Sequence, residues 1–376
     1  MLQALGRVID PELGRDLVSL GMISMNYDVI IAGGSFGGLA AAAQLRGRHV
    51  LLIEPHTIGS VQTSGCGTLL AVLQATGTLD SLLQTHNRIV LHLGQTTFEY
   101  PLPYPFCTFD YQTFCYRLLG QAQVEVLHAS VLGHQGRIVY TSSGAFEAEV
   151  LIDATGWRAA LAKNSRWRAK PFASKSFGLE TNIPVSGEGL HFYYDPHRLR
   201  PFNVGWLFPT GSRSRAGLAN YQGNTQVGGG LSDFVMDRFE CSPSGRHGGY
   251  FPYRRRPATT GNVFRVGDAA GQCIPLTGEG IRPALYFGAQ VGRLARRVLE
   301  GETRLPETLS TYRQFVDSHK GIYRFTLLGQ KIIPGLSIHW IRRLARLVHH
   351  PNCLDPVLRA YWNAMDPLKI GSFTDN

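Results

Sequence analysis

The sequence predicts an α/β fold, in which a Rossmann-like nucleotide-binding domain is interrupted by a mostly antiparallel β-sheet domain and followed by helices. Three observations predict it. Residues 27–32 form a β-branched run that enters a glycine-rich turn and a small-residue helix. A second strand-to-helix turn, with a Gly-Asp pair, follows far downstream at 263–281. Between them, residues 171–255 hold short runs rich in Phe, Tyr and Trp, separated by Pro and Gly as in an antiparallel sheet.

These patterns divide the 376 residues into four parts, with enough chain to bury a substantial core. The parts are an appendage at 1–24, a discontinuous nucleotide-binding domain at 25–170 and 256–300, a sheet domain for the substrate at 171–255 that could include parts of 70–110, and a helical C-terminal region at 301–376. Within the first domain we expect helices at 39–45 and 109–120 and strands at 49–54, 124–127, 136–140 and 150–156.

Composition excludes several classes of protein. A hydrophobic content of 44% and a charged content of 17% are typical of an ordered globular chain. There is no apolar run long enough to span a bilayer and no signal-peptide layout, and the six cysteines lack metal-ligand spacing, so we expect a cytoplasmic protein without a metal site. The net charge of +10 favours an anionic partner, and without a nucleic-acid-binding motif we expect an anionic membrane surface or a phosphorylated substrate.

The first glycine-rich turn, in the run YDVIIAGGSFGGL at 27–39, is typical of a dinucleotide-binding βαβ unit. The next strand, HVLLIE, ends in Glu54, twenty-one positions after Gly33, which is about where a carboxylate meets ribose hydroxyls. Ser35 replaces the middle glycine of G-x-G-x-x-G, and we interpret this as a variant turn, since serine can still donate to phosphate. The cofactor-binding residues expected here are Gly33, Gly34, Ser35, Gly37, Gly38 and Glu54.

The second turn, in VFRVGDAAGQCIPLTGEGI at 263–281, places an acid at the tip of an apolar strand, followed by a loop that enters a helix. Asp268 can accept hydrogen bonds from ribityl hydroxyls, and the glycines let backbone N–H groups approach the pyrophosphate and the N1/O2 edge of a flavin. An early turn combined with this late one predicts FAD. Glu279 is interpreted as a helix N-terminal acid, not a catalytic base. The further expected cofactor-binding residues are Thr155, Gly156, Gly267, Asp268, Gly278, Gly280 and Ile281.

Three stretches resemble the geranylgeranyl reductase family within the p-hydroxybenzoate-hydroxylase-like flavoproteins, over roughly 25–330. The segment 267–281 is similar to that family's Gly-Asp and Pro-Leu-Thr-Gly-Glu-Gly-Ile run. The run 205–209, with Gly217 after it, resembles its aromatic W-x-F-P substrate-pocket motif and the glycine turn that follows. Cys66-Gly67 resembles its Cys-Gly beside the flavin.

The resemblance implies an FAD-dependent oxidoreductase that hydrogenates isolated double bonds of polyprenyl chains, with NADPH, ferredoxin or another electron donor. It implies a substrate pocket that includes Trp206, Phe208, Pro209 and Gly217. The sequence departs from the family at three places: Val204 stands for an aromatic residue, Ala219 ends the later G-x-G, and Tyr111 stands for an arginine. Residues 1–24 resemble about twenty residues of a MIP18-like domain, too few to form a core, and we assign them no function.

Several residues have two interpretations. Cys66 could be a proton source beside the flavin N5 or a small buried thiol. Trp206 and Phe208 face one side of a strand, where they could line an apolar pocket or pack the sheet. In the helix expected at 338–349, Trp340, Ile341, Leu344, Leu347 and Val348 fall on one face and Arg342, Arg343 and Arg346 on the opposite one. That face could lie on an anionic membrane or cover the core; core packing is favoured, with the arginines available to lipid headgroups.

Three functions are compatible with these observations. The main one is an FAD-dependent, geranylgeranyl-reductase-like enzyme that reduces C=C bonds of an isoprenoid or other apolar substrate. A flavin-dependent monooxygenase or halogenase on the same fold is the alternative. A non-catalytic, membrane-associated FAD-binding protein is the second alternative.

Overall fold

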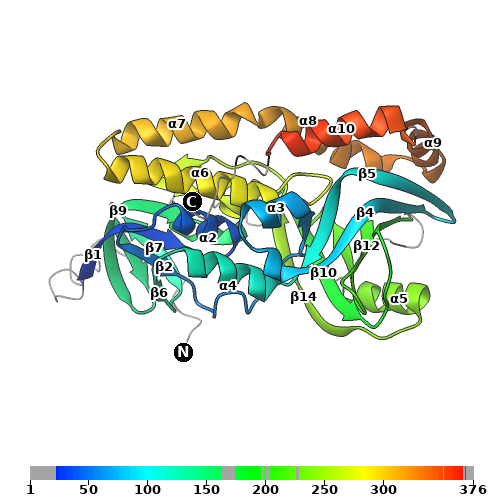
Figure 1. The fold of residues 1–376 in the computed structure, drawn as a ribbon, viewed down its shortest axis with the longest axis horizontal. Coiled ribbons are helices and arrows are strands. Elements are labelled where there is room, and N and C mark those ends of the chain that lie inside the picture. The colour runs from blue at the N-terminus through cyan, green and yellow to red at the C-terminus, as the bar shows by residue number, and fades with distance from the viewer. Residues whose placement is uncertain are drawn as a thin grey trace.

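The computed structural model describes residues 23–162, 174–195, 199, 204–225, 228–349, 351–366 and 369. Residues 1–22, and with them nearly all of the expected appendage, lie outside the described residues. The chain folds into two β-sheets that lie side by side, with a layer of helices along one edge of the molecule (Figure 1). The predicted α/β fold with a second, mostly antiparallel sheet and a helical C-terminus is therefore confirmed.

The first sheet has the strand order β15-β16-β9-β1-β2-β6, in which all neighbours pair in parallel except β15 and β16. Its strands are β1 (Ile23–Ala32), β2 (Val50–Ile53), β6 (Glu125–Leu127), β9 (Gly144–Asp153), β15 (Thr259–Thr260) and β16 (Val263–Arg265), with β7 (Val131–Gln135) and β8 (Ile138–Thr141) joined to β9. β1 is apolar on both faces because both are covered, as parallel sheets require. One face packs under helices and the other under β7 and β8.

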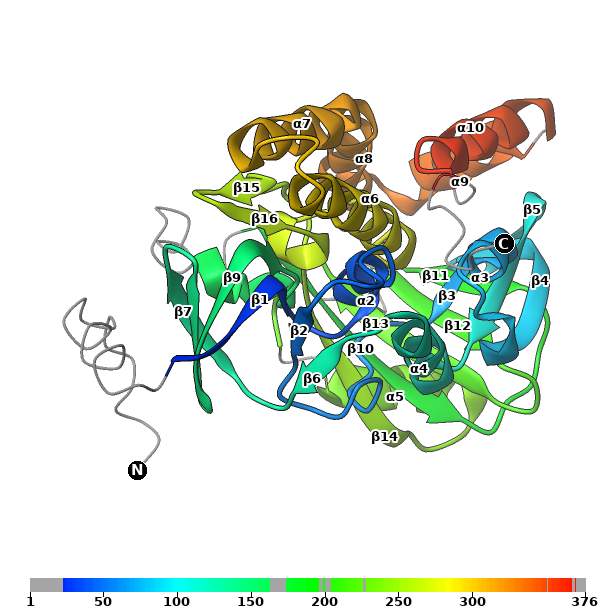
Figure 2. The ribbon, with the colours of Figure 1, turned by 60° about the vertical axis from the view of Figure 1, so that its left-hand side comes forward.

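Helices α2 (Phe36–Ala43) and α6 (Ile281–Leu299) cover this sheet and pack closely on each other (Figure 2). A Cβ atom at Gly288 would lie 2.4 Å from the Gly37 carbonyl oxygen, so the two helix backbones touch where glycine faces glycine.

The helix α4 (Tyr111–Gln121) begins after an N-cap at Asp110, whose carboxylate accepts a hydrogen bond from the Thr113 N–H. The predicted helix at 109–120 is thus confirmed.

The second sheet has the strand order β14-β10-β13-β12-β11-β4-β5-β3. Its strands are β3 (Gly67–Leu69), β4 (Leu82–Leu93), β5 (Thr96–Phe109), β10 (Lys175–Ile183), β11 (Leu190–Tyr194), β12 (Val204–Pro209), β13 (Ser214–Asn220) and β14 (Ser244–Pro252). Only β11 and β4 pair in parallel. Three of these strands, β3, β4 and β5, thus come from residues 67–109. The sequence had not decided which of the two domains this part of the chain belongs to.

One face of the second sheet packs against α5 (Gly228–Phe239), a helix that the sequence did not indicate. Its first residues are three consecutive glycines, which are poor helix formers and hide the periodicity. Two short helical segments, α3 (Leu70–Ala75) and η1 (Leu79–Ser81), connect β3 to β4 within the second sheet.

The C-terminal helices are α7 (Leu305–Ser318), α8 (Lys320–Ile332), α9 (Ile338–Val348) and α10 (Pro351–Asn363), which run along the edge shown at the top of Figure 1. The favoured interpretation of α9 as a core-covering helix is wrong for most of its apolar face. Only Ala345 is buried, and Ile338 and Ile341 pack beside it. Arg342, expected on the outer face, turns toward the sheet and donates to the Leu93 carbonyl oxygen at 2.9 and 3.1 Å.

A buried ion pair anchors the C-terminal helices to the rest of the molecule. Arg282, in the first turn of α6, is fully buried and contacts both carboxylate oxygens of Glu279 at 2.7 and 2.9 Å. The same guanidinium donates to the carbonyl oxygens of Trp362 and Met365, at 2.9 and 2.8 Å. Glu279 therefore serves as the structural partner of an arginine, which agrees with its interpretation as a non-catalytic acid.

We predict that Arg282→Met strongly lowers the free energy of unfolding, because it leaves the Glu279 carboxylate without its partner and the buried carbonyl oxygens of Trp362 and Met365 without a donor. Breaking such a pair costs about 3–5 kcal/mol. The control is Arg359→Gln, which removes the solvent-exposed ion pair with Asp355. Urea denaturation should show a large loss for the first variant and none for the second; equal losses would contradict the anchoring role.

Candidate functional site

The expected cofactor residues gather at one edge of the first sheet. Ala32 is in register with both Ile53 and Asp153, and Asp153 is in register with Arg265, so four parallel strands end together. The segments that follow these strand ends contain the predicted residues, which are Gly33, Glu54, Thr155 and Asp268. Ligands of open α/β sheets bind at the carboxyl ends of the strands, so this edge is the expected place for a nucleotide.

The turn after β1 fits close to the turn after β9. Gly33 has φ 106°, and a Cβ atom there would lie 2.3 Å from the Ala154 carbonyl oxygen, so only glycine fits. The Gly34 N–H donates to Glu54 Oε2 at 2.9 Å, which fixes the carboxylate beside the turn. Ser35 Oγ lies 3.0 Å from Tyr111 Oη. Because no side chain caps α2, its first N–H groups can meet a phosphate.

Asp153 and Thr155 shape the turn after β9. The fully buried Asp153 carboxylate accepts from the Thr155 hydroxyl at 2.6 Å and from the Leu161 N–H at 3.1 Å. The Thr155 hydroxyl also accepts from the Ala160 N–H at 2.6 Å. Thr155 thus builds the turn with its side chain, and only its backbone and Gly156, which begins the short helix η2 (Gly156–Arg158), are left to approach a cofactor.

Asp268 is a half-buried carboxylate at the tip of β16, in the 3-10 turn η5 (Gly267–Ala270). Burial raises its pKa to about 7, although the positive charge of Arg256 acts in the opposite direction. Among the residues that the structure describes, none donates a hydrogen bond to this carboxylate. This carboxylate can therefore accept hydrogen bonds from a ligand, and the ribityl hydroxyls of FAD would donate them. The chemistry of this residue fits the predicted cofactor.

The loop at 275–280 presents the start of α6 to the same region. Leu276 has φ 67°, a left-handed conformation that is strained for leucine. Two hydrogen bonds hold it: its N–H donates to Gln330 Oε1 at 2.7 Å, and Tyr221 Oη donates to its carbonyl oxygen at 2.9 Å. Gly280 precedes Ile281 at the start of α6 without a side-chain cap, so backbone N–H groups at this terminus can meet negative charge. Gly278 in this loop packs against Phe251 of the second sheet.

The second sheet turns an aromatic row toward this edge. Cross-strand partners place His247, Glu180, Gly217, Trp206 and Phe192 side by side, on five consecutive strands from β14 to β11. Side chains that pair directly across strands share one face. Phe208, two residues beyond Trp206, contacts Phe192 edge-to-face with ring centroids 5.5 Å apart. Trp206 and Phe208 therefore face one side, as predicted.

Trp206 lies flat on this face because Gly217 has no side chain. A Cβ atom at Gly217 would lie 2.1 Å from the indole ring. Gly217 is thus a strand residue beneath the indole, not part of a turn as the resemblance implied. The indole N–H donates to Glu180 Oε2 at 2.7 Å, and His247 Nε2 lies 2.7 Å from Glu180 Oε1. Pro209 ends β12, and its carbonyl oxygen accepts from the Thr108 hydroxyl at 2.7 Å.

Cys66 belongs to a turn that touches the aromatic row. Cβ atoms at Gly65 and Gly67 would lie 3.4 and 3.6 Å from the Phe208 ring. Cys66 itself has φ 50° and is fully buried, and its thiol donates to the Ser64 carbonyl oxygen at 3.3 Å. Burial raises the pKa of this thiol well above its ordinary value, so it is neutral. The position is close to the aromatic row, as predicted, but the thiol itself is engaged within its own turn.

Sequence reasoning missed three polar residues of the site. Arg215 donates to the carbonyl oxygens of Gly65 and Phe109, at 3.3 and 3.1 Å, and so ties the turn around Cys66 to β13. Glu180 and His247 form the polar end of the aromatic row, and the Glu180 side chain is only 3% exposed. The strand that carries Glu180 also contains Lys175, Ser176, Thr181 and Asn182, so no local pattern in the sequence indicates this residue. Among the described residues, no cluster of His, Cys, Asp or Glu could hold a metal ion.

We predict opposite effects of Asp268→Asn on the flavin-free and the flavin-loaded protein. Because the pKa of Asp268 is raised in the folded state, ionisation favours unfolding, and the stability of the flavin-free parent falls between about pH 4 and pH 7. The flavin-free variant should therefore be more stable than the parent at pH 8, by up to about 4 kcal/mol, and equal to it below pH 4. Its affinity for FAD should fall by about 1.5–3 kcal/mol, since the amide loses the charge-assisted hydrogen bonds.

Thermal denaturation at the two pH values and flavin titration test this prediction. Asp233→Asn, at an exposed position of α5, is the control and should change neither quantity. A variant that binds FAD as tightly as the parent would place the ribityl chain away from Asp268.

No family model matches the sequence. By sequence the chain is similar to digeranylgeranylglycerophospholipid reductase 3 of Methanosphaera stadtmanae, 27% identical over 188 residues that cover 46% of this chain and 47% of the relative. The digeranylgeranylglycerophospholipid reductase of Haloferax volcanii is 23% identical over 320 residues, 74% of this chain and 78% of the relative. The chain thus spans about half the length of the first of these relatives.

The fold is similar to that of a geranylgeranyl bacteriochlorophyll reductase-like protein from Thermoplasma acidophilum, with a TM-score of 0.78 at 17% identity, over 92% of this chain and 98% of that one. A flavin-dependent brominase matches with a TM-score of 0.67 at 14% identity, over 93% and 95% of the two chains. The resemblance to the geranylgeranyl reductase family, predicted from three short motifs, is confirmed by relatives in sequence and a neighbour in fold.

Proposed function

We propose that the protein is an FAD-dependent reductase that hydrogenates C=C bonds of an isoprenoid or similarly apolar substrate. The observation that carries this proposal is the aromatic row of the second sheet, whose Phe208 packs on the turn around Cys66. Phe251 lies between the row and the edge where the parallel strands end. Cβ atoms added at Gly178, beneath the indole, and at Gly278, in the loop before α6, would lie 3.5 and 3.6 Å from its ring. An apolar surface beside a flavin site suits an alkene that carries no polar group of its own.

FAD would be held by Gly33, Glu54 and Asp268 and by the N-termini of α2 and α6, and it would supply the hydride when bound and reduced. Trp206 and Phe208 would bind the prenyl chain and exclude water from it. Glu180 and His247 act as positioning residues, because the carboxylate fixes the indole of Trp206 through its N–H. Arg215 holds the turn around Cys66 in place.

The reaction also needs a proton on the second carbon of the double bond. Cys66 is our candidate for this donor, since a proton donor must carry its proton before transfer and burial keeps this thiol protonated. The thiol would have to leave its hydrogen bond to the Ser64 carbonyl oxygen in order to act. The electron donor is proposed only as a class: NADPH, ferredoxin or another reductant.

The polyprenyl substrate class is nearly insoluble in water, and we include an anionic membrane surface among the proposed partners because the net charge is +10. No helix in the described part of the chain is both long and apolar enough to cross a bilayer. A membrane contact would therefore involve an exposed surface of the protein.

The purified protein should release FAD and should, with dithionite and without oxygen, add two hydrogens to each reduced double bond of a geranylgeranyl lipid. Mass spectrometry of the lipid measures this gain directly. A strict requirement for oxygen, with a hydroxylated or halogenated product, would support the monooxygenase or halogenase alternative instead. Bound FAD without any product under either condition would support a non-catalytic FAD-binding protein.

Trp206→Ala should raise KM or change the accepted prenyl chain length, while the FAD content stays that of the parent. The reason is that a buried indole contributes on the order of 150–250 Å² of contact surface. The matched control is Leu207→Ala, the neighbouring residue of β12, whose side chain packs toward α5 on the opposite face. Leu207→Ala should lower the melting temperature without changing substrate preference. The same change of preference in both variants would mean that the aromatic row only packs the sheet.

A further inference from the structure

Helix α9 exposes a stripe of large apolar side chains that the core does not use. Trp340, Leu344 and Leu347, spaced as neighbours along one side of the helix, are 57%, 47% and 70% exposed. The helix is nevertheless firmly docked, because Ile338, Ile341 and Ala345 pack against β4 and β5 on its other side. Tyr100 also donates to the Ala345 carbonyl oxygen at 2.9 Å. We call Trp340, Leu344 and Leu347 the apolar stripe. A partner could therefore bury this stripe without any movement of α9.

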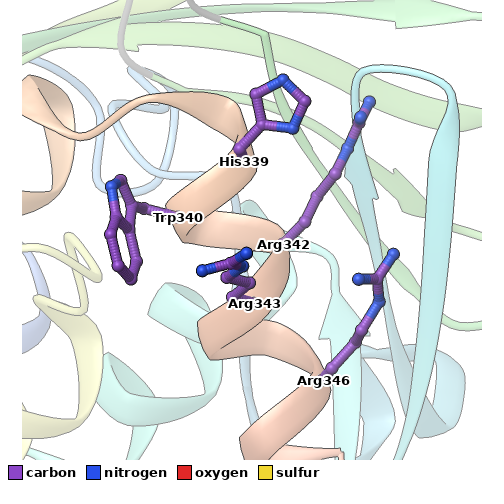
Figure 3. A pocket seen from close by; sticks show the side chains of 5 residues that line it. All are labelled: His339, Trp340, Arg342, Arg343 and Arg346. Atoms are coloured by element: carbon purple, nitrogen blue, oxygen red, sulfur yellow. The ribbon is translucent and has the colours of Figure 1, made fainter.

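A basic stripe runs beside the apolar one. His339, Arg343 and Arg346 are exposed on the adjoining side of α9, and the Arg343 guanidinium lies 5.2 Å from the Trp340 ring centre. Together with Trp340 and Arg342 they line a cavity of about 420 Å³, which is formed by α9 and not by the residues of the candidate FAD site (Figure 3). The side chains of Arg342 and Arg346 extend to the same side of the helix, while Trp340 points away from them (Figure 3).

The charged residues of α8 and α9 themselves all have the same sign. Residues 320–349, which form α8, α9 and their connection, include six Lys or Arg residues and no Asp or Glu. The preceding helix α8 also exposes apolar side chains, and Phe325 and Leu328 are 72% and 56% exposed. A partner for this region must accept apolar side chains and carry negative charge next to them.

We propose that α9 docks the protein on an anionic phospholipid surface, with the apolar stripe at the acyl boundary and Arg343 and Arg346 on headgroup phosphates. The proposed function includes an anionic membrane among the partners, and this proposal names α9 as the part of the protein that binds it. It rests on the features of α9 alone. A bilayer surface offers apolar and anionic zones in parallel layers, as the two stripes require. Tryptophan next to arginine is typical of helices that lie at this interface. An acidic protein groove is the other occupant, and the experiment below separates the two.

The test uses the full chain with vesicles of phosphatidylcholine alone, or of equal parts phosphatidylcholine and phosphatidylglycerol, in the absence of substrate and reductant. We expect cosedimentation with the mixed vesicles only, and loss of binding at high salt because headgroup attraction is screened. The double variant Arg343→Gln with Arg346→Gln should bind at least about twentyfold more weakly, at about fivefold per arginine. Leu344→Gln with Leu347→Gln should also lose binding.

Matched controls lie elsewhere on the surface. Met236→Gln replaces a 50% exposed apolar residue of α5, and Arg137→Gln removes a 56% exposed arginine on the turn before β8. Both should bind the mixed vesicles like the parent, and circular dichroism should show that every variant is folded. Equal binding to both vesicle types, no binding to either, or controls as weak as the α9 variants would each overturn the proposal and leave a protein partner for this face. Vesicle binding requires no turnover, so a failed reduction assay would not affect it.

Discussion

The parallel register of β1, β2, β9 and β16 is the constraint on which the candidate site depends. Ala32, Ile53, Asp153 and Arg265 end the four strands at one level, although they come from segments up to 233 positions apart in the chain. Three of these strands are then followed by a candidate cofactor residue. Gly33, Glu54 and Asp268 therefore lie at the same edge of the sheet, although they come from separate segments of the chain.

The second constraint is the fit between the two sheets. Gly33 fits against Ala154 within the first sheet, whereas Arg215 and Phe251 join the second sheet to the loops that surround the proposed flavin. The floor of the aromatic row is flat because Gly217 carries no side chain, and the indole above it is fixed by Glu180. A buried carboxylate beneath an aromatic surface is costly unless it is hydrogen-bonded, and here the Glu180 carboxylate has two partners at 2.7 Å. This arrangement would present a rigid aromatic surface to the proposed apolar substrate.

The sequence predicted the fold and the grouping of the cofactor residues, because both follow from local patterns. A β-branched run, a glycine turn and an acid at a strand end each occupy a few residues, and the topology of parallel sheets brings them together. The alternation of Trp206 and Phe208 on one strand face was predictable for the same reason. Glu180, His247 and Arg215 were not, since their roles depend on which strands become neighbours, and no short motif records that pairing.

The outward face of α9 shows the limit of helical periodicity. An amphipathic pattern states that one side is apolar, but the side that meets the core is Ile338, Ile341 and Ala345, not the stripe with the largest side chains. Periodicity alone does not decide which side of such a helix meets the sheet.

The proposal that a prenyl chain lies on the aromatic row beside FAD is best tested by an experimental structure of the FAD-loaded protein with a polyprenyl lipid. The account predicts the isoalloxazine at the turn of Gly65 to Gly67 and the lipid against Trp206 and Phe208; a lipid bound away from this row would contradict it.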